Sequence, residues 1–172
     1  MSTKETLEQL AGRVGAALKR NEMMLATAES CTGGWLGQAV TAIAGSSDWY
    51  ERGFITYTYL SKREMLGVSA EALERHGAVS EPTVREMAQG ALAHSHAHVA
   101  AAISGIAGPS GGSPGKPVGT VCFAWAMRGG PVVSATRQLE GDRESVRRQS
   151  VGIGLAGILD LFHGEKTTGS NG

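Results

Sequence analysis

The chain has 172 residues, a length that predicts one domain with a hydrophobic core of its own. Sixteen Lys and Arg balance sixteen Asp and Glu, so the chain lacks the cation surplus that general nucleic-acid or anionic-membrane binding requires. Its 41% hydrophobic content excludes disorder of the whole chain. Two cysteines, no apolar segment of about 20 residues and no apolar signal region near Met1 predict a cytoplasmic protein without disulfides.

Hydrophobic periodicity predicts helices and strands that alternate along most of the chain. In chain order we expect a helix over 3–20, a strand over 23–28, a helix over 35–43, a strand over 54–59, short helices within 61–76, a helix over 80–97, strands over 99–104, 118–127 and 132–139, and a helix over 142–162. This order predicts the α/β class, as a single-domain three-layer α/β/α sandwich with a mixed, mostly parallel sheet. We expect the domain to span residues 1–165 and residues 166–172 to form a flexible tail.

Two glycine-containing loops follow predicted strands and are candidate ligand sites. Ser30, Thr32, Gly33 and Gly34 form a turn before a helix, where hydroxyls and unpaired backbone N–H groups attract anions. The loop over 104–112 contains four glycines, which let a backbone approach a ligand closely. Ligands of open α/β sheets bind at the carboxyl ends of strands, so both loops together predict a site for a phosphorylated small molecule. The alternative is that both are only tight turns.

Two other motifs favour structural interpretations. The sequence Gly152-Ile153-Gly154-Leu155-Ala156-Gly157 matches a dinucleotide fingerprint, but it lies inside a predicted helix, where small residues permit close packing. His94, His96 and His98 alternate and would share one face of a strand. They lie at the end of a predicted helix without a further ligand, so a metal site is the less favoured interpretation.

Two nucleophiles are possible. Ser47 lies in the break after the second predicted helix, and Lys62 follows 15 residues later, so a desolvated lysine could act as the base for this serine. Cys31 lies at the predicted start of a helix, where the pKa of a thiol is lowered. The alternative for Cys31 is a small apolar residue packed beneath the turn.

Several motifs in one order carry a resemblance to a known family. The motifs are Thr27-Ala28-Glu29-Ser30-Cys31-Thr32-Gly33-Gly34, Gly45-Ser46-Ser47, Gly53-Phe54-Ile55-Thr56-Tyr57, Gly77-Ala78-Val79-Ser80, Ser104-Gly105-Ile106-Ala107-Gly108-Pro109, Lys116-Pro117-Val118-Gly119-Thr120-Val121 and Gly141-Asp142-Arg143. Together they resemble the CinA C-terminal domain family over residues 5–163, in the form of its stand-alone nicotinamide-nucleotide amidases. One departure lies at Tyr59, where relatives commonly have Asn. Another is Ser110, where Asp is common.

The resemblance implies hydrolysis of the carboxamide of nicotinamide mononucleotide to nicotinate mononucleotide and ammonia, without metal or cofactor, often in a homodimer. It implies Ser47 as nucleophile, Lys62 as base and Tyr57 close to both. The two loops and the resemblance together predict a set of substrate-binding residues: Ser30, Thr32, Gly33, Gly34, Ser104, Gly105, Gly108 and Arg143. Two alternatives stay open: a Cys31-dependent amidase for another nucleotide, and a domain that binds a nucleotide or a protein partner without catalysis.

Overall fold

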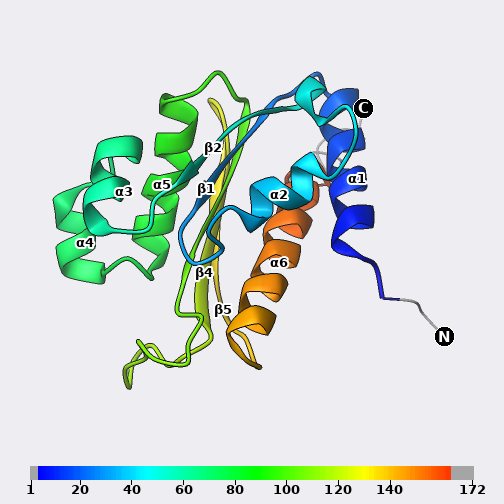
Figure 1. The fold of residues 1–172 in the computed structure, drawn as a ribbon. Helices are drawn as coiled ribbons and strands as arrows, with labels where there is room; N and C mark the ends of the chain where they lie inside the picture. Colours follow the sequence, from blue (N-terminus) through cyan, green and yellow to red (C-terminus); the bar gives the residue numbers. More distant parts are fainter. Residues whose placement is uncertain (1–3, 164–172) are drawn as a thin grey trace, which may run out of the picture.

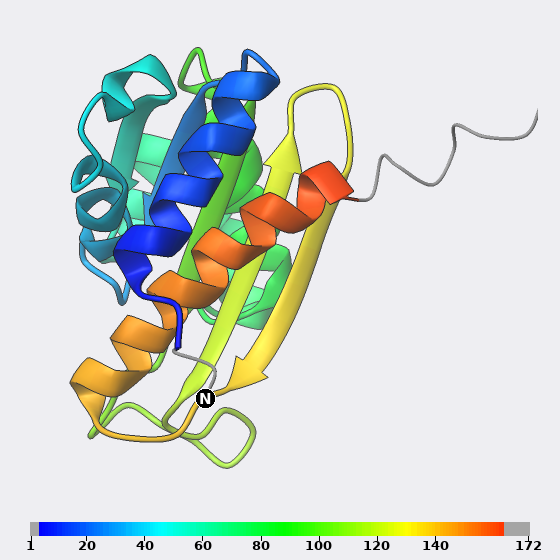
Figure 2. The same cartoon turned by 90° about the vertical axis from the view of Figure 1, so that its right-hand side faces the viewer.

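A five-stranded sheet forms the centre of the protein (Figures 1 and 2). The computed structural model describes residues 4–163, so the predicted tail over 166–172 lies outside the described residues. The strands, in the spatial order β2-β1-β3-β4-β5, are β1 (Leu25–Glu29), β2 (Tyr50–Ile55), β3 (Val99–Gly105), β4 (Thr120–Met127) and β5 (Val132–Gln138). Strands β2, β1 and β3 are parallel, β4 is antiparallel to β3, and β5 is antiparallel to β4. Four strands therefore run in one direction, which confirms the predicted mixed, mostly parallel sheet.

Helices cover both faces of this sheet (Figure 1). One face is covered by α1 (Leu7–Arg20), α2 (Trp35–Thr41) and α6 (Arg143–His163), and the other by α3 (Tyr59–Leu66), α4 (Ala70–His76) and α5 (Glu81–Ala93). A short 3-10 helix, η1 (Ser46–Asp48), precedes β2. The three-layer α/β/α sandwich is thus confirmed. None of the helices within residues 4–163 is long and apolar enough to cross a membrane.

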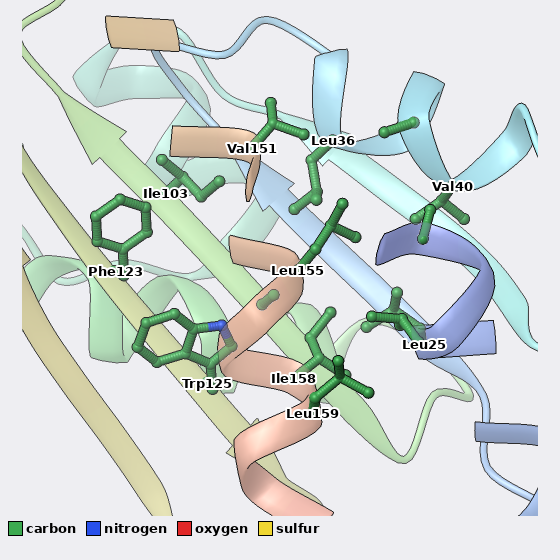
Figure 3. Close-up of a cluster of buried hydrophobic side chains, with 14 of the residues drawn as sticks. Leu25, Leu36, Val40, Ile103, Phe123, Trp125, Val151, Leu155, Ile158 and Leu159 are labelled. Atoms are coloured by element: carbon green, nitrogen blue, oxygen red, sulfur yellow. The ribbon is translucent and has the colours of Figure 1, made fainter. Parts of the chain in front are cut away.

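The two faces of the sheet differ in the size of their side chains. Ile103, Phe123 and Trp125 point toward α6, where they meet its buried residues Leu155 and Ile158 (Figure 3). In β1, β3 and β4 the opposite face carries alanines and one cysteine against α5, namely Ala26, Ala28, Ala100, Ala102, Cys122, Ala124 and Ala126. Side chains of successive strand residues point to opposite faces, so alternation of large and small residues produces this asymmetry. Small residues allow α5 to pack close to the strands that end at the candidate site.

The strand predicted over 54–59 lies four residues earlier, as β2. Thr58 and Ser61 form a capping box, in which each side chain accepts a hydrogen bond from the backbone N–H of the other. This box starts α3 at Tyr59. The β-branched and aromatic residues after Ile55 therefore form a connection and a helix start. As a consequence, Lys62 lies in α3, with its side chain directed into the core instead of following a strand.

Gly90 sets how closely α5 approaches the end of α3. A Cβ at this position would lie 1.9 Å from the carbonyl oxygen of Leu66, the last residue of α3. We expect Gly90→Ala to lower the free energy of unfolding by at least about 2 kcal/mol in urea denaturation, because the two backbones must move apart.

Gly12→Ala is the matched control for this prediction. Gly12 also lies inside a helix, α1, and a Cβ there would have its nearest neighbour, Ile43 Cδ1, at 4.0 Å. This substitution should stabilise the protein by about 0.5–1 kcal/mol, through the reduced entropy of the unfolded chain. Equal effects of the two substitutions would contradict the steric explanation.

Candidate active site

A cavity of about 210 Å³ opens where the parallel strands β1 and β3 end. Its lining comes from the segment after β1, the end of β3 and the loop that follows, the connection into α3, the loop before α5, and the start of α6. The lining residues are Ser30, Cys31, Tyr57, Tyr59, Lys62, Ala78, Val79, Ser104, Gly105, Ala107 and Arg143. This is the edge of an α/β sheet at which ligands bind.

Lys62 and Ser30 form a buried pair in the wall of this cavity. The Nζ atom of Lys62 lies 2.9 Å from Ser30 Oγ and donates a second hydrogen bond to the carbonyl oxygen of Thr56 at 2.7 Å. Lys62 is 1% exposed and Ser30 is 9% exposed. The lysine therefore reaches its partner from α3 through the protein interior, and both residues contribute to the lining of the cavity.

Burial changes the acidity of this lysine. No carboxylate contacts its Nζ atom within residues 4–163, so the cost of desolvating the ammonium is not offset by an ion pair. Burial lowers the pKa of Lys62 from 10.5 to about 8. A fraction of the side chain is then uncharged near neutral pH, and in this form its nitrogen has a lone pair that can accept a proton from Ser30. The pair has the geometry and the acidity of a nucleophile with its general base.

Glu29 shapes the turn that carries Ser30. Its buried carboxylate accepts hydrogen bonds from the hydroxyl of Thr32 at 2.6 Å and from the backbone N–H groups of Leu36 and Gly37 at 2.8 and 3.1 Å. A carboxylate at the amino end of a helix satisfies its unpaired donors. The anion site predicted at the start of α2 is therefore filled by the protein itself, and Thr32 is directed to Glu29. Gly33 and Gly34, with φ of 58° and 104°, complete the turn and do not line the cavity.

We expect Glu29→Gln to destabilise the protein by about 1–3 kcal/mol, because one of three buried donors then faces an NH₂ group. The turn that holds Ser30 should loosen as well, so turnover should fall more than substrate binding does. Urea denaturation and steady-state kinetics measure the two effects. Glu64→Gln, on the exposed side of α3, is the control and should change the unfolding free energy by less than about 0.5 kcal/mol. The prediction is contradicted if both variants behave alike.

Arg143 and Tyr57 form the solvent side of the cavity. Arg143 Nη1 donates to the carbonyl oxygen of Gly108 at 2.8 Å, and Nη2 donates to the Tyr57 hydroxyl at 3.1 Å. Gly108 thus contributes by holding the arginine and does not line the cavity. Ser104 is 1% exposed, and its hydroxyl has no hydrogen-bond partner within the described chain. Arg143 supplies a positive charge, and Ser104 supplies a free hydroxyl.

Ser47 lies at the opposite end of the strands from the cavity. It belongs to η1, before Tyr50, which pairs with Leu25 at the start of β1, whereas Ser30 follows the end of β1. The five residues of β1 put about 15 Å between these two ends. Ser47 is also exposed. The predicted pair of Ser47 with Lys62 is therefore not formed, and Ser30, predicted only as a binding residue, occupies its place.

The structure argues against the thiol alternative. Cys31 is buried, and burial raises the pKa of its thiol from 9.0 to about 11, so the thiolate is scarce at neutral pH. Cys31 lines the cavity next to Ser30, which it follows in the sequence.

Two of the three alternating histidines form hydrogen bonds with backbone groups. His98 Nδ1 accepts from the N–H of Met24, and His94 Nδ1 pairs with the carbonyl oxygen of Gly90. Across residues 4–163, no three His, Cys, Asp or Glu side chains are arranged to hold a metal ion.

Six of the eleven predicted site residues line the cavity: Ser30, Tyr57, Lys62, Ser104, Gly105 and Arg143. Four further lining residues are not predicted as site residues by the sequence: Tyr59, Ala78, Val79 and Ala107. Tyr59 could have been suspected, because it replaces a polar residue between Tyr57 and Lys62. Ala78 and Val79 have no chemical signature, and only the packing of the loop before α5 reveals their position.

The family model of the CinA C-terminal domain matches residues 7–162, so the chain belongs to this family and the predicted resemblance is confirmed. The nicotinamide-nucleotide amidohydrolase PncC of Escherichia coli (strain K12) is 51% identical over 160 residues, which are 93% of this chain and 97% of that protein. PncC of Pseudomonas putida is 48% identical over 157 residues, covering 91% and 98%. The crystal structure of competence/damage inducible protein CihA from Agrobacterium tumefaciens superposes with a TM-score of 0.89 at 44% identity, covering 94% of this chain and 99% of that one.

Proposed function

We propose that this protein hydrolyses the carboxamide of nicotinamide mononucleotide to nicotinate mononucleotide and ammonia, with Ser30 as nucleophile and Lys62 as general base. The observation that carries the proposal is the buried contact of 2.9 Å between Lys62 Nζ and Ser30 Oγ at the cavity wall. Relatives named nicotinamide-nucleotide amidohydrolase, about half identical over nearly the whole chain, support the choice of substrate.

The first half of the reaction transfers the acyl group to the serine. Uncharged Lys62 accepts the proton of Ser30 while Oγ attacks the amide carbon, and a tetrahedral intermediate with a negatively charged oxygen forms. The carbon–nitrogen bond then breaks, and Lys62 returns its proton to the leaving nitrogen. Ammonia departs, and a nicotinoyl ester of Ser30 remains. In the second half, Lys62 accepts a proton from water, the resulting hydroxide attacks the ester, and Ser30 leaves protonated with the carboxylate product released.

Two backbone N–H groups of the lining residues are suited to stabilise the negatively charged oxygen. Cys31 directly follows the serine, and Ala107 lies in the loop after β3. Neither N–H donates to a backbone acceptor within residues 4–163. An oxyanion donor of this kind contributes roughly 3–4 kcal/mol to acyl transfer in comparable sites.

The solvent side of the cavity is suited to a phosphate group. Arg143 is exposed and carries a charge that the two hydrogen bonds to Gly108 and Tyr57 do not neutralise. Its guanidinium is held in one orientation by these bonds, which favours recognition of a phosphate oxygen without a further ordering cost. The nicotinamide would then lie inside, near Ser30 and Ser104, with the ribose between them. Tyr57 contributes by holding Arg143.

Other parts of the interpretation stay predictions. A cytoplasmic location, a homodimer and activity without a cofactor follow from the sequence and the family resemblance alone. Light scattering of the purified protein measures the oligomeric state. Activity after treatment with a chelator tests the absence of a metal requirement.

Release of ammonia from nicotinamide mononucleotide tests the proposed function. The purified protein is incubated with the nucleotide in the presence of EDTA, and ammonia and nicotinate mononucleotide are quantified together. Equal amounts of the two products support the proposal. A folded protein that binds the nucleotide without releasing ammonia would instead support the alternative of a binding domain.

A further inference from the structure

The charges around the cavity are unusual for a site that would receive a pyridinium nucleotide. The lining contains two cations, Lys62 and Arg143, and no carboxylate. Two acids are next to lining residues in sequence, and both accept hydrogen bonds from backbone N–H groups at helix starts: Glu29 at α2 and Asp142 at α6. Nicotinamide mononucleotide carries a positive charge on its ring nitrogen in addition to its negative phosphate. The ring must therefore enter a space where no anionic side chain attracts it.

Two tyrosines are the lining groups that can attract such a ring. Tyr57 lies in the connection before α3, Tyr59 is the first residue of α3, and both line the cavity. The hydroxyl of Tyr57 accepts a hydrogen bond from Arg143 at the start of α6. The hydroxyl of Tyr59 lies toward the loop before α5, 3.7 Å from where a Cβ of Gly77 would be. The two hydroxyls thus lie toward different elements of the lining, that of Tyr57 toward α6 and that of Tyr59 toward the loop before α5.

The exposure of these tyrosines is also informative. Tyr57 is 61% exposed and Tyr59 is 51% exposed, so neither serves the hydrophobic core. Large exposed aromatic surface at the rim of a cavity is a feature of ligand sites. The face of an aromatic ring carries partial negative charge and attracts a cation without itself being charged.

We propose that Tyr59, together with Tyr57, selects substrates whose ring is a positively charged pyridinium over those whose ring is neutral. The inference rests on the proposed function, because it assumes that the nicotinamide end of a nucleotide enters this cavity. Tyr59 is the residue to test, because Tyr57 has a second task in holding Arg143. Tyr59 carries both an aromatic ring and a hydroxyl, and the comparison of Tyr59→Phe with Tyr59→Leu separates their contributions.

A pair of ligands isolates the ring charge. Nicotinamide mononucleotide and its reduced dihydro form share the phosphate, ribose and carboxamide, but the reduced ring is neutral. Binding is measured by isothermal titration calorimetry in the Ser30→Ala protein, so that neither ligand is hydrolysed. The quantity of interest is the dissociation constant of the reduced nucleotide divided by that of the oxidised one.

We expect Tyr59→Leu to lower this ratio by about three- to tenfold, through weaker binding of the oxidised nucleotide alone. Tyr59→Phe keeps the aromatic face and should leave the ratio within twofold of the parent. Leu60→Ala is the matched control, because Leu60 is adjacent in α3 and 60% exposed but does not line this cavity. It should leave the ratio unchanged.

The outcomes separate this inference from the proposed function. If both nucleotides bind and Tyr59→Leu leaves the ratio unchanged or weakens both equally, the inference is overturned and the amidase proposal stands. A loss of selectivity in Tyr59→Phe as well would assign the effect to the hydroxyl and would also overturn it. If neither nucleotide binds to a folded Ser30→Ala protein that has wild-type stability, both proposals fail.

Discussion

Ser30→Ala is expected to reduce ammonia release from nicotinamide mononucleotide by at least about 10³-fold, with the fold unchanged. The substitution removes the oxygen that lies 2.9 Å from Lys62 Nζ and faces the cavity. No other hydroxyl is in contact with that nitrogen within residues 4–163. Turnover should therefore fall, while nucleotide binding, measured by calorimetry, should change little. The activity that remains would come from backbone donors and from the position of the bound amide.

Two other substitutions make this experiment decisive. Ser47→Ala changes an exposed serine at the opposite edge of the sheet and should keep wild-type turnover. Cys31→Ala changes the other nucleophile of the lining, whose thiol is held protonated by burial, and should keep most of the activity. If Ser30→Ala remains active and Cys31→Ala does not, the nucleophile is the thiol. Loss of activity in Ser47→Ala alone would restore the pair that the sequence predicts.

The alternation of helices and strands could be predicted because each buried strand carries its own local signal. Val99–Gly105 and Thr120–Met127 are continuous apolar segments, and they form β3 and β4 almost where the sequence places them. The second strand was misplaced because β-branched and aromatic residues over 54–59 resemble a strand. A capping box between Thr58 and Ser61 determined the structure there. The capping signal consists of only two polar residues, and the hydrophobic residues around them suggest a strand instead.

The proposed pair of Ser30 and Lys62 could be predicted only in part, because it depends on the topology of the sheet. Lys62 was found through its spacing in the family motif, but its partner depends on which edge of the sheet each serine reaches. The parallel register of β1 with β2 sends Ser30 to the edge where Lys62 enters and Ser47 to the other. The role of Glu29 could not be predicted either, because it too depends on contacts that form only in the folded protein. Its side chain closes a turn with residues three, seven and eight positions away, which no pattern of residue types reveals.

Lys62→Met is expected to abolish turnover to a similar extent, at least about 10³-fold, because no other base contacts Ser30 Oγ within the described residues. Lys62→Arg should be equally inactive, since a guanidinium keeps its proton throughout the accessible pH range. In the wild type, kcat/KM should rise with pH and level off above a pKa near 8, as the uncharged lysine becomes the dominant form. The measurement is a pH profile from 6 to 9.5. A profile without this rise would contradict the role of Lys62 as base.

The lowered pKa of Lys62 should also make the free energy of unfolding depend on pH. Its pKa in the folded protein, about 8, lies below the 10.5 of the unfolded chain, so the unfolded state binds more protons between these values. The free energy of unfolding should therefore rise with pH across this window, by about 3 kcal/mol at most. Lys62→Met should lack this rise, so its stability relative to the wild type should be greater at pH 7 than at pH 10. Urea denaturation of both proteins at the two pH values measures this difference. The proposed catalytic role and stability thus make opposite demands on this position, because the desolvation that lowers the pKa of Lys62 to about 8 also lowers the free energy of unfolding near neutral pH.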